Sequence, residues 1–132
     1  MHMLHHVSLG VEDLARSARF YDGALIPLGY VRVWEHDEAI GYGPAGGGDK
    51  FAIKLVTEGF VAPVGGFHLA FTASSRDQVN TFYAGAMAAG GTGNGPPGLR
   101  SHYGPHYYAA FVIDPDGHHV EAVINTPTDV RG

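Results

Sequence analysis

Leu4-His5-His6-Val7-Ser8-Leu9-Gly10 is a short stretch with the two-residue alternation of a strand, and its pattern is repeated 62 residues later in the chain. A histidine opens each copy. Shifting the sequence by that distance aligns identical residues: His6 with His68, Phe20 with Phe82, Tyr21 with Tyr83, Gly23 with Gly85, Ala24 with Ala86 and Gly29 with Gly91. Self-similarity at a fixed offset is the signature of a repeated structural unit. The sequence therefore predicts an internal duplication.

The composition is that of a globular protein with many histidines. The 132 residues suffice for one well-buried core, so we expect a single domain over residues 1–132 in which the two copies share that core. Nine histidines in this length direct attention to metal or acid–base chemistry. The chain has no cysteine, which excludes disulfides, thiolate metal ligands and cysteine nucleophiles.

The charge and hydropathy patterns exclude two classes of partner. Eight Lys and Arg against thirteen Asp and Glu give a net charge of −5, without the basic stripe of a nucleic-acid-binding protein. No apolar run approaches the roughly 20 residues that span a membrane. The first residues lack a basic region followed by an apolar segment, so we expect no signal peptide and a cytoplasmic location.

The sequence pattern of each copy predicts one strand, one helix and three further strands. Alternation favours strands over residues 4–10, 30–36, 39–42 and 51–57 in a first module of about 3–58, and over 67–73, 107–113 and 118–125 in a second module of about 67–126. Residues 59–66 are the linker, and residues 93–104 form a long loop with room for one short strand. Asp13 and Ser75 are expected to cap the helices.

Alternation also predicts which side chains meet. His6 lies on one face of the first strand, His68 occupies the matching face in the second copy, and Glu121 shares a face of the last strand with His119. If both modules curl their strands around one axis, these residues come together. Two imidazoles and one carboxylate form the facial ligand set that suits Fe(II), and also Mn, Ni or Zn.

The chain resembles the vicinal oxygen chelate superfamily, which includes glyoxalases, extradiol dioxygenases, fosfomycin-resistance enzymes and bleomycin-binding proteins. The resemblance rests on four stretches of sequence: residues 4–14, Phe20-Tyr21, residues 66–71, and Phe111-Val112-Ile113-Asp114-Pro115-Asp116-Gly117 running on to Glu121. It implies an α+β fold in which paired βαβββ modules form a cupped eight-stranded mixed sheet, usually in a homodimer. It also implies a divalent metal ion held by His6, His68 and Glu121.

One position departs from the glyoxalase pattern. Aligning residues 52–56 with residues 119–123 puts Lys54 where glyoxalases carry a second glutamate, and an ammonium group has no lone pair for a metal. This argues against isomerisation of a glutathione hemithioacetal. Lys54 either extends into solvent or anchors an anionic group of the substrate.

Further candidates lie in the second module. One group either forms a surface loop with strand aromatics or lines a pocket and transfers protons: Arg100, His102, Tyr103, His106, Tyr107 and Tyr108. We expect His119 to stand beside the ligands and His118 to face solvent.

These features favour a metal-dependent enzyme that acts on a small oxygenated substrate, by lyase, isomerase or dioxygenase chemistry. A ligand-sequestering protein of the bleomycin-resistance kind and a fosfomycin-type transferase are the alternatives. A protein with a vestigial site is a third possibility, to which the lysine lends weight.

Overall fold

The computed structural model describes residues 3–63 and 65–127, and it contains the two expected modules. The first comprises β1 (Val7–Val11), α1 (Leu14–Leu25), the short 3-10 helix η1 (Ile26–Leu28), β2 (Tyr30–His36), β3 (Ala39–Pro44) and β4 (Phe51–Leu55). The second comprises β5 (Leu69–Thr72), α2 (Arg76–Ala88), β6 (Thr92–Gly93), β7 (Gly98–Leu99), β8 (Tyr107–Ile113) and β9 (His119–Asn125). The α+β class and the paired arrangement are confirmed.

The strands of one chain lie in two sheets. The first module forms a four-stranded sheet in the order β1-β4-β3-β2, and the second forms a five-stranded sheet in the order β5-β9-β8-β6 with β7 also paired to β8. The second sheet exceeds the expected four strands because the glycine-rich segment supplies two short strands, β6 and β7, instead of one. Both sheets are mixed, since β1 runs parallel to β4 and β5 runs parallel to β9.

Local sequence determines where each helix starts. Asp13 caps α1 by accepting a hydrogen bond from the Arg16 N–H at 3.0 Å, and Ser75 caps α2 by accepting one from the Gln78 N–H at 3.1 Å. Gly29 closes the first helical segment with a φ of +92°, a left-handed conformation that glycine adopts without strain. The caps predicted from the sequence are therefore confirmed.

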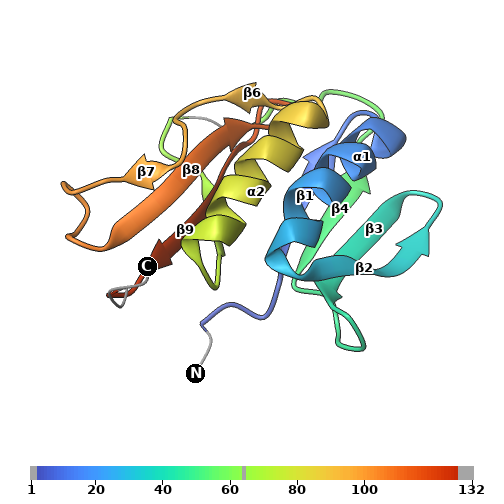
Figure 1. Cartoon of the computed structure of the whole chain (residues 1–132). Coiled ribbons are helices and arrows are strands. Elements are labelled where there is room, and N and C mark those ends of the chain that lie inside the picture. Colours follow the sequence, from blue (N-terminus) through green and yellow to red (C-terminus); the bar gives the residue numbers. More distant parts are fainter. Residues whose placement is uncertain (1–2, 64, 128–132) are drawn as a thin grey trace.

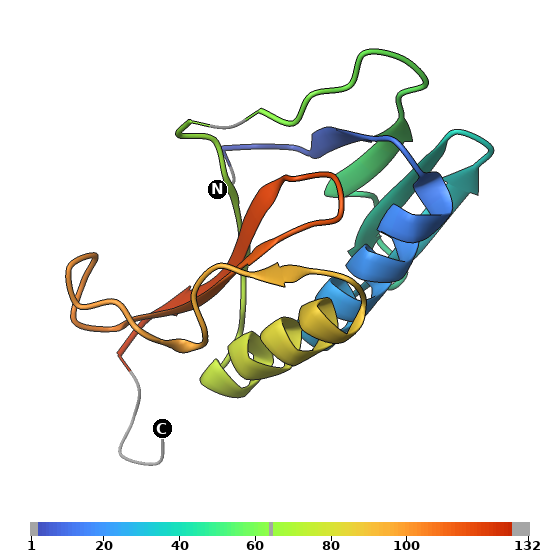
Figure 2. The same cartoon turned by 90° about the horizontal axis from the view of Figure 1, so that it is seen from above.

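Both helices cover the same side of the molecule, with a sheet behind each of them (Figures 1 and 2). The core lies between the helices and the sheet faces that they cover, and its largest buried side chains include Phe20, Tyr21, Phe82 and Ile53. The opposite sheet faces carry Lys54 and Glu121, one in each module. The position of the candidate site is therefore set by strand alternation and by which face the helices cover.

The helices cross where repeat-related glycines meet. A Cβ atom built on Gly23 would lie 2.8 Å from the backbone oxygen of Gly85, and one built on Gly85 would collide with the backbone oxygen of Gly23. Only a hydrogen atom fits between the two helices here. The close packing of α1 on α2 therefore requires glycine at both positions.

The turn between β8 and β9 ties the second module to the first. The buried Asp116 carboxylate accepts hydrogen bonds from the Glu12 N–H, the Arg16 guanidinium and the Ser17 hydroxyl, at 2.9, 3.0 and 2.7 Å. Asp114 accepts one from the hydroxyl of buried Tyr21 at 2.5 Å, and burial together with this carboxylate raises the pKa of that phenol well above its usual value.

His118 is buried, so the expectation that it faces solvent is wrong. Its side chain is 1% exposed, and its Nε2 lies 2.7 Å from the Gly10 carbonyl oxygen, to which the Nε2–H tautomer donates. The Phe60 ring packs edge-on against the imidazole, with 5.4 Å between ring centroids. The linker covers this histidine through Phe60, a tertiary contact that the local sequence pattern does not indicate.

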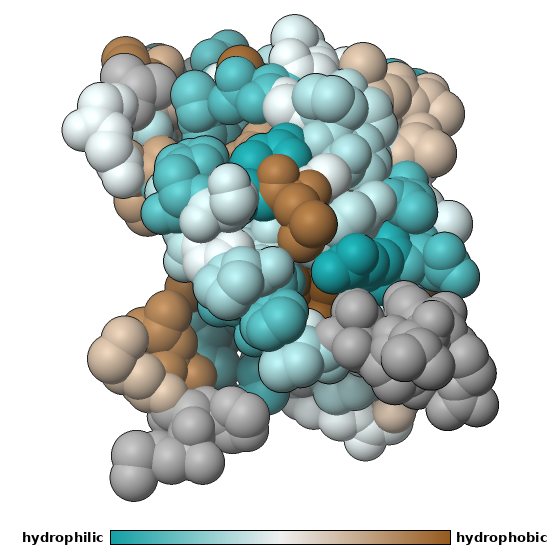
Figure 3. Space-filling view, turned by 60° about the vertical axis from the view of Figure 1, so that its left-hand side comes forward, coloured by the Kyte–Doolittle hydropathy of each residue, from teal (hydrophilic) through white to brown (hydrophobic). Residues whose placement is uncertain are grey.

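No helix among the described residues is long and apolar enough to cross a membrane. On the face shown in Figure 3, which brings the β7 side of the molecule forward, apolar residues are scattered among hydrophilic ones. That face therefore shows no broad apolar patch.

Replacing Gly85 by alanine tests the helix crossing. Alanine within a helix is ordinarily about 1 kcal/mol more favourable than glycine. Here the added methyl group collides with the backbone of Gly23, so we expect a net loss of about 1–3 kcal/mol in the free energy of unfolding, measured by denaturant titration. Gly48→Ala is the control, because a methyl group there meets nothing within 4 Å. A Gly85→Ala protein as stable as the wild type would show that the helices separate freely.

Candidate metal centre

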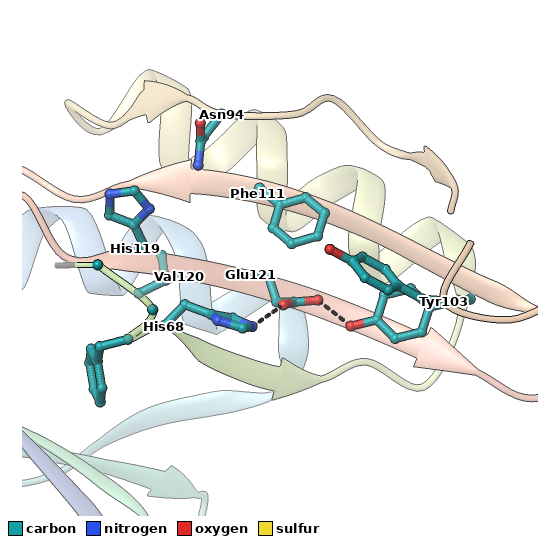
Figure 4. Close-up of a pocket in the computed structure, with 11 residues that line it drawn as sticks. His68, Asn94, Tyr103, Phe111, His119, Val120 and Glu121 are labelled. Carbon is teal, nitrogen blue, oxygen red and sulfur yellow. Dashed lines mark hydrogen bonds and ion pairs between the residues drawn. The ribbon is translucent and has the colours of Figure 1, made fainter. Parts of the chain in front are cut away.

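A cavity of about 540 Å³ opens on the uncovered face of the second module's sheet. Its walls combine phenylalanine and tyrosine rings with several polar side chains (Figure 4). The lining residues are Gly65, Gly66, Phe67, His68, Asn94, Tyr103, Tyr107, Phe111, His119, Val120 and Glu121. A concave, largely apolar pocket with few convergent polar groups is the usual form of a small-molecule site.

Glu121 is the central polar residue of this cavity. It is 1% exposed, and its two carboxylate oxygens have different partners: His68 Nε2 lies 2.9 Å from Oε1, and the Tyr107 hydroxyl donates to Oε2 at 2.7 Å. The His68 side chain is 53% exposed, so its ring covers the carboxylate from the solvent side. No lysine or arginine is among the described residues that line the cavity, so His68 and Tyr107 are the polar partners of this buried carboxylate.

Three elements bring these side chains together. In β9, Glu121 pairs with Ala70 of β5 and with Phe111 of β8, so all three share the uncovered face. His68 immediately precedes β5, and Tyr107 begins β8. Burial and the hydrogen bond to Glu121 raise the pKa of the Tyr107 phenol, which keeps its hydroxyl protonated and able to donate.

The structure brings His68, Glu121 and Tyr107 together, but it does not bring His6 to them within one chain. His6 is exposed, precedes β1, and lines a separate cavity of about 270 Å³ together with His5, whose Nδ1 lies 2.8 Å from the Nδ1 of His6. Among the described residues, no group of three or more His, Asp or Glu side chains is placed to hold one metal ion. One chain therefore supplies two neighbouring donors of the predicted three.

The strand register corrects the alignment used for Lys54. Val7 pairs with Phe51, and its repeat partner Leu69 pairs with Val120, so the residue of the first module that matches Glu121 is Ala52. Lys54 lies two residues further along the same face of β4 and is exposed. A shift of two residues preserves the alternation of a strand, so the sequence pattern does not reveal it. Lys54 does not line the cavity of its own chain.

Of the group predicted to line a pocket, Tyr103 and Tyr107 line this cavity and His102 does not. His102 is exposed and absent from the cavity wall, while its neighbour Tyr103 lines the cavity. The two rings are in contact, tilted by 41° with centroids 4.1 Å apart. His119 lines the cavity, on the face expected from alternation.

Sequence reasoning did not single out Phe67, Asn94 and Phe111, which also line the cavity. Phe111 could have been found, because the tight turn at residues 114–117 sets it opposite Glu121. Asn94 lies in a loop without periodicity and gave no such signal.

Comparisons with known proteins agree on the family. The profile of the glyoxalase/bleomycin resistance protein/dioxygenase superfamily matches residues 3–122. An uncharacterised protein of Bacillus subtilis, YqjT, is 33% identical over 91% of this chain and 97% of its own length.

Two solved structures show the same likeness. A glyoxalase/bleomycin resistance protein from Albidiferax ferrireducens is 32% identical, with a TM-score of 0.80 over 92% of this chain and 98% of that one. A glyoxalase-related enzyme from Fulvimarina pelagi is 28% identical, with a TM-score of 0.72 over 100% of this chain and 96% of that one. The chain therefore belongs to the glyoxalase/bleomycin resistance protein/dioxygenase superfamily, which is the vicinal oxygen chelate superfamily.

Proposed function

We propose that this protein is a metal-dependent enzyme that acts on a small oxygenated substrate in the cavity beside Glu121. The observation that carries the proposal is the close approach of His68 Nε2 and Glu121 Oε1 at 2.9 Å, at the wall of an aromatic-lined cavity. Superfamily membership supports the same reading, because the superfamily contains many enzymes, and its members typically use a divalent metal ion.

The two donors fit a divalent ion. Two ligand atoms bonded at about 2.1 Å and at right angles lie about 3 Å apart, which is close to the separation of the imidazole nitrogen and the carboxylate oxygen. The ion would also neutralise a carboxylate whose cavity contains no lysine or arginine. Fe, Mn, Ni and Zn all accept this donor set, and the residues do not select among them.

The residues of the chain then have separate tasks. His68 and Glu121 would hold the ion, which would supply Lewis-acid stabilisation of negative charge that develops on a bound substrate. The rings of Phe67, Phe111 and Tyr103 would pack against the substrate's carbon skeleton. Lyase, isomerase and dioxygenase reactions all use such stabilisation.

Metal content tests the proposal directly. Protein purified without added metal or chelator is expected to contain Fe, Mn, Ni or Zn near one ion per chain by elemental analysis, and His68→Ala and Glu121→Gln are expected to lose it. His36→Ala is the matched control, because His36 is an exposed histidine at the end of β2. Protein that holds no metal and takes up none of these ions would instead be a ligand-sequestering cup.

We also propose that His6 of a second copy completes the ligand set in a homodimer. β1 pairs only with β4 and β5 only with β9 among the described strands, so each sheet has an unpaired edge beside its histidine. The sheet faces opposite the helices are also available for a second copy. A twofold dimer that sets the first module of one copy against the second module of the other would bring His6 to His68 and Glu121.

Mixing two variants tests this shared site. Neither His6→Ala nor Glu121→Gln alone is expected to hold metal. After joint unfolding and refolding in equal amounts, half of the dimers are mixed, and each mixed dimer has one intact site. Metal content should therefore return to about a quarter of the wild-type value. His36→Ala in place of His6→Ala is the control, because His36 is an exposed histidine at the end of β2. If mixed dimers form and the metal content of the mixture does not recover, all of the metal ligands come from one chain.

We propose that in such a dimer Lys54 faces the cavity of the other copy and anchors an anionic group of the substrate. The expected result of Lys54→Met is an approximately tenfold weaker binding of oxalate to the metal-loaded dimer, measured by calorimetry. Lys50→Met is the control, because it removes the same charge nearby. Equal oxalate affinity in the wild type and in Lys54→Met would leave Lys54 as a solvated surface residue.

A further inference from the structure

We infer that Tyr107 is a positioning residue that limits Glu121 to a single coordinating oxygen. The inference rests on the proposed function, because it concerns how the chain presents this carboxylate to a metal ion. It goes beyond that function by giving Tyr107 a task other than proton transfer.

The two oxygens of Glu121 are not equivalent. Oε1 faces the imidazole of His68, on the side where a second metal donor is available. Oε2 faces the other way and accepts the hydroxyl of Tyr107 at 2.7 Å, as the two dashed lines of Figure 4 show. With this hydroxyl in place, Glu121 is 1% exposed.

The surroundings hold Tyr107 in place for this contact. Its ring packs against Tyr103, with 5.1 Å between the ring centroids, and its N–H donates to the Gly104 carbonyl at 3.3 Å. The residue also begins β8, where it pairs with Asn125 of β9, the strand that carries Glu121. The phenol and the carboxylate are therefore fixed relative to each other by two paired strands.

Losing the hydroxyl would change how the carboxylate binds. A buried oxygen left without a donor pays the full cost of its desolvation, so Oε2 would turn toward the nearest positive charge. In a loaded site that charge is the metal ion, and a carboxylate that binds through both oxygens occupies two positions. Fewer positions then remain for the two oxygens of a substrate. Tyr107 thus preserves the open coordination that the proposed function needs.

The test compares two single-hydroxyl deletions in the Co²⁺-loaded protein. Tyr107→Phe is expected to change the affinity for Co²⁺ by about 10–100-fold, measured by chelator competition, because partners that orient a ligand have effects of this size. It is also expected to change the visible absorption spectrum of Co²⁺, which reports the number and arrangement of ligands. A purely structural role for Tyr107 would leave this spectrum unaltered.

Tyr108→Phe is the matched control. Tyr108 is the next residue of β8 and points to the opposite face, where its hydroxyl donates to Asn80 Oδ1 at 2.7 Å. Tyr108→Phe therefore loses one hydroxyl and one hydrogen bond outside the cavity. The affinity of this variant for Co²⁺ and its visible absorption spectrum are expected to match those of the wild type.

The outcomes separate the two proposals. Wild-type affinity and spectrum in Tyr107→Phe overturn the positioning role and leave the metal site intact. A wild-type protein that binds neither Co²⁺ nor the metals named above overturns the proposed function, and the positioning role with it. An equal change in Tyr107→Phe and Tyr108→Phe also overturns the positioning role, because the effect would then belong to the strand and not to the contact with Glu121.

Discussion

The close contact between Gly23 and Gly85 is the constraint on which the arrangement of the two modules depends. These glycines occupy equivalent positions in the repeat, and the helices cross where neither carries a side chain. Each helix covers its own sheet, so the separation of the helices also sets the separation of the sheets. A larger residue at either position would move the modules apart and open the core that they share.

The aspartates of the β8–β9 turn add specific hydrogen bonds between the two modules. Asp116 binds the start of α1, and Asp114 binds Tyr21 from the same helix, so the turn of the second module is held by the first. Glu121 follows this turn by a few residues on β9. The network therefore fixes the strand that carries the central carboxylate, and it links the stability of the fold to the position of the candidate site.

Much of the fold was predictable, because its signals are local. The repeat, the caps at Asp13 and Ser75 and the alternation of the strands each depend on residues close together in the chain. The same alternation placed His119 on the face of Glu121, and both residues line the cavity. The prediction failed at His118, because Phe60 of the linker covers it from a distant part of the sequence.

The sequence by itself determined the fold class, the family and the donor types of the candidate site, since these depend on periodicity and on residue identity. Only the tertiary structure decided which donors meet in one chain. It joined His68, Glu121 and Tyr107, left His6 beside another cavity, and showed by strand register that Ala52, not Lys54, matches Glu121. The physical reason is that alternation specifies the face of a strand but not its register or the strand beside it, which depend on hydrogen bonds and packing between distant segments.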